Sequence, residues 1–235
     1  MEKIARLRRS GVASTYVTPK TAGLAPQLQE YLLAYGAPRD EVLRDLEEET
    51  RQLFPEVVRM QISPEQGRFM TLLTRLLGVR FAVEIGTFTG YSSLCVARGL
   101  APGGRLLCCD LSEEYTALAR RYWKRAGVED RVELRLGPAL DTLRALPDEP
   151  QIDLAFIDAD KTGYVDYWEE VVPRVRSGGV ILVDNVFAGG QVADPEAGGE
   201  NARAIRRFNE HAAADDRVEL VMLPIADGLT LARRR

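Results

Sequence analysis

The sequence predicts an α/β protein in which a mostly parallel sheet carries helices on both faces and follows a set of N-terminal helices. From Phe81 onward, short apolar runs alternate with helix-length amphipathic stretches, the pattern of right-handed βαβ units. Before Phe81 the apolar spacing is helical. Near the end, residues 216–234 contain two strand-like runs without a helix between them, which predicts an antiparallel hairpin at the sheet edge.

One domain is expected, because 235 residues with 46% hydrophobic side chains suffice for one substantial core. Within it, residues 1–23 mix basic residues with Gly, Ser, Thr and Pro, which predicts an N-terminal arm. Residues 24–78 are expected to form a helical preface, and residues 79–235 the α/β core.

The preface contains three predicted helices, and the core contains five buried strands before the terminal hairpin. Helices are expected over 24–35, 38–54 and 63–78, the last with Ser63 as N-cap and Pro64 at its first position. Strands are expected at the apolar runs 81–86, 105–110, 132–137, 152–158 and 178–184.

Composition excludes several classes of function. The net charge of -4 gives no electrostatic reason to bind nucleic acid or an anionic membrane, although Arg233–Arg235 are expected to form a solvated basic tail. No secretory signal or membrane-length apolar run is found, so a cytoplasmic protein is expected. The three cysteines, with Cys108 and Cys109 adjacent on a strand, predict buried reduced thiols. His211 is the only histidine, which disfavours Ser-His-Asp, Cys-His and multi-histidine zinc sites.

The end of the first strand has the features of a cofactor turn. Glu84 precedes the run, and Gly86 and Gly90 permit a tight turn with close backbone approach to a ligand, although packing glycines are the structural alternative. Asp110 closes the second strand at about the 20-residue spacing at which an acid binds ribose hydroxyls in nucleoside-binding folds. Because Phe88 stands where a dinucleotide site has its middle glycine, a nucleoside cofactor without a pyrophosphate is favoured over NAD.

A second group of polar residues closes the fourth and fifth strands. The run Asp158-Ala159-Asp160-Lys161 ends one strand and Asp184-Asn185 ends the next, and both should open onto the same crevice. Two carboxylates and an amide oxygen form an all-oxygen set that suits a hard cation. Mg²⁺ is the preferred ion, with Mn²⁺ and Ca²⁺ as alternatives. A single strand-terminal Asp is more often a helix cap or a loop anchor, and the alternative for Lys161 is a surface lysine paired with Asp160.

In order along the chain, the runs RMQISPEQGRFM, EIGTFTGYS, GPALDTL, DADK, DN and DGLTLARR resemble the cation-dependent O-methyltransferases typified by catechol and caffeoyl-coenzyme A O-methyltransferases. The likeness extends from about Lys20 to Arg235. It implies a Rossmann-like fold with a seven-stranded sheet that binds S-adenosylmethionine. Several motifs that match in order are far more specific than any one of them.

The resemblance implies roles for individual residues. Lys161 matches the catalytic base, and Lys20 matches a substrate contact. The residues that match metal ligands are Asp158, Asp184 and Asn185. Those that match cofactor-binding positions are Ile62, Glu84, Gly86, Thr87, Ser92, Asp110, Ala139 and Asp160, with Glu84 and Ser92 near the methionine part and Asp110 on the ribose.

The expected enzyme is an S-adenosylmethionine- and metal-dependent O-methyltransferase for a small phenolic or catechol substrate, in a bacterial natural-product pathway. The segment after Asn185 and the run ENARAIRRFNEH lack the aromatic residues of the plant enzymes, so a coenzyme A thioester is disfavoured. The Gly-rich run 189–201 is expected to overhang the site and set substrate choice. The family implies a homodimer. Two alternatives are a non-catalytic S-adenosylmethionine sensor and a nicotinamide-dependent oxidoreductase.

Overall fold

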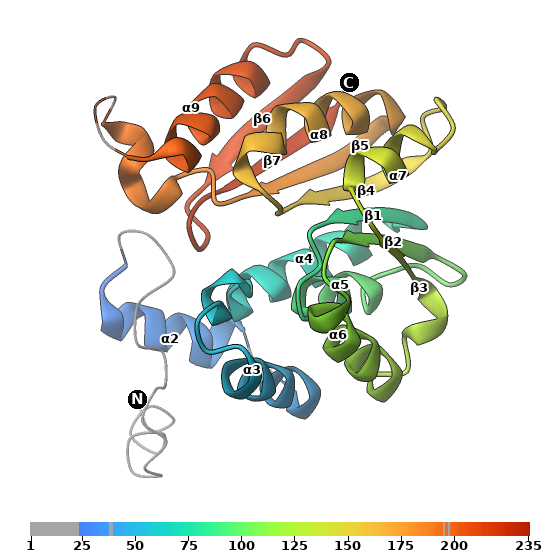
Figure 1. Ribbon diagram of the computed structural model, residues 1–235, viewed down its shortest axis with the longest axis vertical. Helices are drawn as coiled ribbons and strands as arrows, with labels where there is room; N and C mark the ends of the chain where they lie inside the picture. Colours follow the sequence, from blue (N-terminus) through green and yellow to red (C-terminus); the bar gives the residue numbers. More distant parts are fainter. Residues whose placement is uncertain (1–23, 38–39, 195, 197) are drawn as a thin grey trace.

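The computed structural model describes residues 24–37, 40–194, 196 and 198–235. These residues form a seven-stranded sheet with the strand order β3-β2-β1-β4-β5-β7-β6 (Figure 1). The strands are β1 Phe81–Ile85, β2 Arg105–Asp110, β3 Val132–Leu136, β4 Ile152–Ile157, β5 Val175–Asp184, β6 Val218–Leu223 and β7 Leu229–Arg234. The first five pair in parallel, whereas β7 runs antiparallel to both β5 and β6. The predicted α/β class and the terminal hairpin are therefore confirmed.

Helices cover both faces of this sheet (Figure 1). One face carries α4 Pro64–Leu76, α5 Tyr91–Ala97 and α6 Glu113–Arg125, with α2 Pro26–Gly36 and α3 Glu41–Leu53 outside them. The other face carries α7 Ala139–Arg144, α8 Tyr164–Val171 and α9 Glu200–Ala213. Short 3-10 turns connect these elements: η1 Val58–Met60, η2 Glu129–Arg131, η3 Lys161–Gly163, η4 Val172–Arg174 and η5 Ala188–Ala193.

Local capping sets where the preface helices begin. The predicted start of the third helix is confirmed, because Ser63 accepts a hydrogen bond from the Gln66 amide at 3.4 Å and Pro64 occupies the first turn. The second helix begins at Glu41, later than predicted, because Asp40 caps it by accepting from the Leu43 amide at 3.0 Å.

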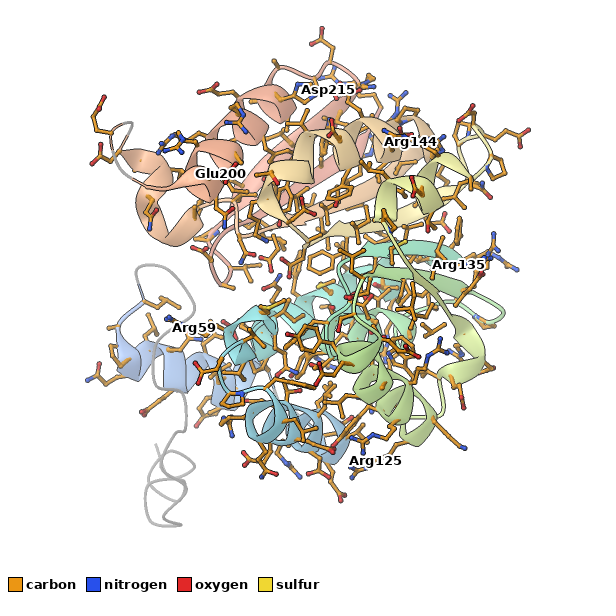
Figure 2. All side chains as sticks on the ribbon, in the orientation of Figure 1. Arg59, Arg125, Arg135, Arg144, Glu200 and Asp215 are labelled. Atoms are coloured by element: carbon orange, nitrogen blue, oxygen red, sulfur yellow. The ribbon has the colours of Figure 1, made fainter. Side chains whose placement is uncertain are left out.

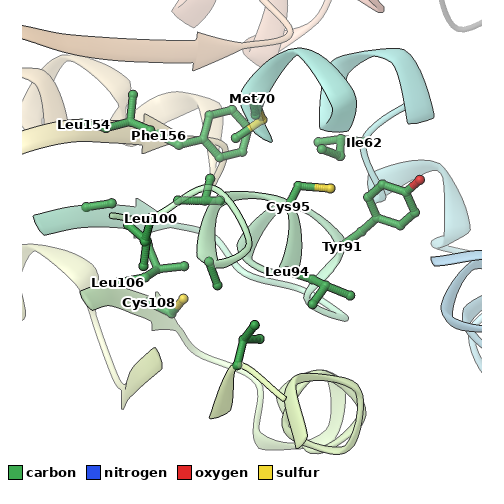
Figure 3. Packing of buried hydrophobic residues seen from close by; sticks show 14 of the residues in the cluster. Ile62, Met70, Tyr91, Leu94, Cys95, Leu100, Leu106, Cys108, Leu154 and Phe156 are labelled. Atoms are coloured by element: carbon green, nitrogen blue, oxygen red, sulfur yellow. The ribbon is translucent and has the colours of Figure 1, made fainter. Parts of the chain in front are cut away.

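The core is divided into two layers by the sheet, because successive strand residues point to opposite faces. Cys108 packs in the layer beneath α4, α5 and α6, together with Met70, Leu94 and Phe156 (Figure 3). Cys109 packs in the other layer, beneath α7, α8 and α9. The described cysteines are free and buried, as predicted.

The basic end of the chain is not a solvated tail, so that prediction is wrong. Arg233 and Arg234 belong to β7, and the Arg235 amide donates to the carbonyl oxygen of Arg217 at 3.0 Å. Backbone pairing outweighs the preference of arginine for solvent here, because the side chains can extend outward while the main chain completes the ladder.

Charged side chains project from helices on both faces of the sheet, as Arg125 on α6 and Arg144 on α7 illustrate (Figure 2). Among the described residues, no helix combines the length and the apolar character that a membrane crossing requires.

Candidate functional site

A cavity of about 1360 Å³ lies at the carboxyl ends of the central strands. Its wall combines the turn after β1, the ends of β2, β4 and β5, and residues 58–63 of the helical preface. Ligand pockets commonly measure about 300–1,000 Å³, so this cavity has room for a cofactor and an acceptor together.

Two glycines shape the turn between β1 and α5. Gly86 has φ +88°, and a Cβ atom there would lie 2.0 Å from the carbonyl oxygen of Asp158. Gly90 has φ +87°, and its Cβ atom would lie 2.6 Å from the Cβ atom of Ala119 on α6. The turn therefore needs glycine at both positions, for conformation and for space. The contact at Gly86 also joins the turn directly to the end of β4.

Asp110 holds the same turn from the end of β2. One carboxylate oxygen accepts the backbone amides of Thr87 at 2.9 Å and Phe88 at 2.8 Å, and the other accepts the Ser112 amide at 2.8 Å. Three backbone donors thus fix the orientation of the carboxylate, which lines the cavity. Its remaining lone pairs are available to hydroxyl groups of a ligand.

Glu84 and Thr87 carry polar atoms that the protein leaves unpaired. Glu84 is fully buried; Oε2 accepts the Cys108 thiol at 3.4 Å, while Oε1 has no hydrogen-bond partner among the described residues. Burial raises the pKa of Glu84 to about 8, against the opposing influence of the nearby Ser92 hydroxyl. The Thr87 hydroxyl is likewise buried without a described partner. Of the two, only Thr87 lines the cavity, so its hydroxyl can bind a polar group of a ligand there, whereas Glu84 lies behind the cavity wall.

Two of the three predicted metal residues converge on one side-chain ammonium group. Nζ of Lys161 lies 2.9 Å from Oδ1 of Asp158, 2.7 Å from Oδ1 of Asn185 and 2.6 Å from the Tyr164 hydroxyl. The Tyr164 hydroxyl in turn donates to the backbone carbonyl of Asp184 at 3.1 Å. A cation therefore already lies where two of the three predicted ligand oxygens meet.

Electrostatics at this cluster favour additional positive charge. Burial, followed by the neighbouring charge of Asp158, raises the pKa of Asp184 to about 7. Asn185 adopts φ +57°, a left-handed backbone conformation that asparagine tolerates. Its backbone N–H donates to Oδ1 of Asp184 at 2.8 Å. Two acids crowded beside an amide oxygen, with no thiolate or imidazole among them, match the donor set of a hard dication.

Considered by acids, cysteines and histidines alone, the described residues contain no group of three or more arranged to hold a metal. The predicted set has only two carboxylates and takes its third oxygen from an amide. The fit to a metal therefore depends on Asn185 as a ligand.

Asp160 does not join that cluster. It accepts the Tyr167 hydroxyl at 2.5 Å and the Gly163 amide at 3.0 Å, so it caps η3 and faces the cavity from its rim. Tyr167 also lines the cavity, and burial raises the pKa of its phenol well above the usual range. The phenol therefore remains protonated and acts as a donor.

Most of the predicted site residues line this one cavity. They are Ile62, Gly86, Thr87, Ser92, Asp110, Ala139, Asp158, Asp160, Lys161, Asp184 and Asn185. Glu84 is not a wall residue, although its sequence neighbours Ile85 and Gly86 are. Lys20 lies outside the described residues.

Three residues of the site were not identified from the sequence. Tyr164 contacts Lys161 from three positions along the chain, and Tyr167 binds Asp160 from seven positions along. Gln66 is fully buried on α4 and lines the cavity beside Asp184, and neither of its polar side-chain atoms has a hydrogen-bond partner among the residues that the structure describes. Helical spacing could have indicated the two tyrosines, whereas Gln66 gave no signal.

Comparison with known proteins identifies the family. The profile of the O-methyltransferase family matches residues 34–235. The chain belongs to the O-methyltransferase family. Probable caffeoyl-CoA O-methyltransferase 1 of Dictyostelium discoideum is 40% identical over 224 residues, which cover 92% of this chain and 97% of that protein.

Solved O-methyltransferases share the fold. The O-methyltransferase of Bacillus cereus in complex with SAH is 36% identical, with a TM-score of 0.80 over 89% of this chain and 97% of that one. TomG of Streptomyces achromogenes, involved in tomaymycin synthesis and solved in complex with SAM, is 33% identical, with a TM-score of 0.80 over 88% of this chain and 96% of that one. The family resemblance in the sequence is thereby confirmed.

Proposed function

We propose that this O-methyltransferase transfers the methyl group of S-adenosylmethionine (SAM) to a hydroxyl of a small catechol-like or phenolic acceptor, with a divalent cation, Mg²⁺ before Mn²⁺ or Ca²⁺, bound by Asp158, Asp184 and Asn185. The observation that carries the proposal is the convergence of Asp158 and Asn185 on the Lys161 ammonium at 2.9 and 2.7 Å, beside the buried carboxylate of Asp184. SAM-bound and SAH-bound relatives of the same fold support the cofactor.

The turn after β1 and the end of β2 would bind the cofactor. When bound, SAM supplies a methyl group on a sulfonium, which is activated for transfer because a neutral thioether is the leaving group. The Thr87 hydroxyl offers a partner to its methionine end, and Glu84 would act there from behind the cavity wall, by its charge and by the position it gives the turn. Asp110, fixed by three backbone amides, offers lone pairs to the ribose hydroxyls. These groups act by binding and orientation, which place the methyl group near the acceptor.

The ends of β4 and β5 would bind the cation and receive the acceptor. When bound, a divalent cation lowers the pKa of a hydroxyl beside it. Lys161 is the proposed proton acceptor at Nζ. In this structure Nζ makes three hydrogen bonds, to Asp158, Asn185 and Tyr164, as a charged lysine does. To accept the proton of the acceptor hydroxyl, Nζ must give up at least one of these contacts.

The acceptor is proposed to be small. A second cavity of about 560 Å³ adjoins Lys161 and Asn185, and Gln191, Asn201 and Ile205 line its far side. Much of its wall comes from η5 and the start of α9, and Gln191, Gly199, Glu200 and Asn201 in that wall belong to the predicted substrate-selecting run 189–201. In Figure 2, Glu200 marks this end of α9. The modest volume and the mixed polar and apolar wall suit one substituted aromatic ring.

The test is methyl transfer from labelled SAM to a panel of simple catechols and phenols, with Mg²⁺ and with EDTA. The parent is compared with Asp158→Asn and with the control Asp166→Asn, an exposed acid on α8. We expect activity to disappear with EDTA and to fall at least 100-fold in Asp158→Asn, with the control unaffected. Transfer that persists in EDTA would overturn the metal requirement while leaving methyl transfer intact.

The sensor alternative is kept because it needs only the cofactor half of the site. It predicts tight SAM binding without turnover on any acceptor. The cluster of Asp158, Lys161 and Asn185 has no role in such a protein, which favours the enzyme. The nicotinamide-dependent alternative is disfavoured by membership in the O-methyltransferase family.

We also propose a cytoplasmic homodimer. Exposed apolar side chains on the outer helices support dimerisation; these are Leu28, Tyr31 and Tyr35 on α2 and Leu72 and Leu76 on α4. Light scattering after size-exclusion chromatography tests it, and a monomer at micromolar concentration would contradict it.

A further inference from the structure

Helix α3 of the preface contacts the cofactor turn through two neighbouring side chains. Thr50 and Phe54 are four positions apart, so they lie on one side of the end of α3. Their partners, Thr89 and Phe88, are consecutive residues of the turn between β1 and α5. The C-terminal end of α3 therefore packs against the turn that Gly86 and Gly90 shape.

The first contact is a buried group of three polar side chains. Oγ1 of Thr50 donates to Oγ1 of Thr89 at 3.0 Å, and Nε2 of Gln61 approaches these two oxygens at 3.3 and 3.2 Å. Thr50 and Thr89 are fully buried, and Gln61 is 6% exposed. Gln61 also lines the large cavity, so this group reaches from α3 to the cavity wall. Buried hydrogen bonds of this kind fix relative position, because an unpaired member is costly.

The second contact is a group of three aromatic rings. The ring of Tyr115 meets those of Phe54 and Phe88 edge-on, with centroids 4.9 Å apart in each pair, and Phe54 lies 6.3 Å from Phe88. Phe88 and Tyr115 line the cavity, whereas Phe54 packs behind them. Each such edge-to-face pair contributes packing beyond simple burial.

The turn needs this support, because Phe88 has φ +49°, a left-handed conformation that is rare for a bulky residue. Asp110 accepts hydrogen bonds from the Thr87 and Phe88 amides on the sheet side of the turn. On the helical side, the end of α3 contacts the side chains of Phe88 and Thr89. Helix α3 is itself anchored to α6, where Glu49 accepts the Tyr122 hydroxyl at 2.8 Å.

We propose that α3 is part of the cofactor-binding device and that Thr50 is a positioning residue, which acts on the cofactor through Thr89 without touching it. The inference rests on the proposed use of SAM. By linkage, the coupling is reciprocal: a cofactor that is bound by the ordered turn also stabilises the end of α3.

The experiment measures binding of S-adenosylhomocysteine (SAH) by calorimetry to the parent, Thr50→Val, Thr50→Ser and the control Thr74→Val. Valine keeps the shape of threonine and removes the hydroxyl, and serine keeps the hydroxyl. Thr74 is also fully buried, but its hydroxyl donates to the carbonyl of Met70 within α4, at 2.7 Å. We expect Thr50→Val to weaken SAH binding about 3- to 10-fold, with Thr50→Ser near the parent and Thr74→Val unchanged.

Two further readouts separate positioning from general destabilisation. In a methyl-transfer assay, Thr50→Val should raise the KM for SAM and leave kcat at saturating SAM within about twofold, since the reacting groups are untouched. In hydrogen exchange, SAH should protect amides near the end of α3 in the parent and less so in Thr50→Val. Phe54→Leu provides a second variant should Thr50→Val not fold, with the same expected direction.

Equal SAH affinity of Thr50→Val and Thr74→Val, with unchanged α3 protection, would overturn the inference while leaving the proposed function standing. A parent that binds neither SAM nor SAH would overturn the proposed function and this inference with it. Recovery of affinity in Thr50→Ser would identify the hydroxyl as the group responsible, because a packing role predicts that valine is tolerated better than serine.

Discussion

Gly86→Ala tests the close contact between the cofactor turn and the end of β4. An alanine at φ +88° pays the cost of a left-handed backbone, roughly 1–2 kcal/mol. Its Cβ atom would also lie 2.0 Å from the Asp158 carbonyl oxygen, and contacts under 3.0 Å force a shift, so the two segments must separate by about 1 Å. Overpacking of this size costs roughly 1–3 kcal/mol more. We expect a total destabilisation of about 2–5 kcal/mol.

The matched control is Gly78→Ala. Gly78 has φ +60° and nothing within 4 Å of its Cβ position, so it carries only the conformational cost. Urea unfolding of both variants and the parent at pH 7 gives the free energies of unfolding. The dependence of each free energy on urea concentration is compared, to check that the three proteins unfold in equivalent transitions. A Gly86→Ala variant no less stable than Gly78→Ala would refute the reasoning about the contact. We also expect Gly86→Ala alone to lose methyl transfer, because the shift displaces Asp158.

Two other variants probe hydrogen bonds between side chains that do not line the cavity. Hydrogen bonding to Arg217, together with the Trp168 indole, holds the pKa of Asp215 well below its usual range. A depressed pKa stabilises the fold above about pH 4, the unfolded value, and that stabilisation is lost as the pH falls toward the folded value. We therefore expect Asp215→Asn to destabilise the protein by about 1–3 kcal/mol at pH 7, and the difference in urea midpoint to shrink below pH 4. Ser93→Ala leaves the buried Trp123 indole, which donates to Ser93 at 2.9 Å, without its acceptor; about 1–3 kcal/mol should be lost in urea unfolding followed by tryptophan fluorescence.

The controls for these variants are exposed residues of the same types. Asp216→Asn changes an exposed acid next to Asp215, and Ser177→Ala removes an exposed hydroxyl in β5. If Asp215→Asn destabilised the protein equally at all pH values, the depressed pKa of Asp215 in the folded protein would be contradicted. A Ser93→Ala variant as stable as Ser177→Ala would show that the indole finds another partner. Figure 2 shows Asp215 at the end of α9 opposite to Glu200, so effects on methyl transfer should be small.

The strand ends were predictable because they are local and periodic. Apolar runs of about six residues that stop at an acid place Asp110, Asp158 and Asp184 at one edge of the sheet, whatever the details of packing. The convergence of Asp158 and Asn185 followed from the adjacency of β4 and β5, which the βαβ pattern implies.

Contacts between distant segments were not predictable. The group formed by Thr50, Gln61 and Thr89 depends on where the preface packs, and no periodicity encodes that. The sequence did not show that Glu84 is fully buried behind the cavity wall, because a residue of a central strand can lie near a cavity without being exposed to it. The basic end was misread because its charges hide a strand whose backbone pairs on both sides.

The placement of β7 between β5 and β6 has a consequence for synthesis. As the chain emerges from the ribosome, β5 is complete long before its neighbour, residues 229–234, has been made. Until then the apolar run 180–183 presents an unpaired edge, and Asp184 lacks the ladder that pairs it with Leu229. The end of β5, where Asp184 lies, therefore completes its pairing only after β7 has been made, and nascent chains stalled before residue 229 should require chaperone protection.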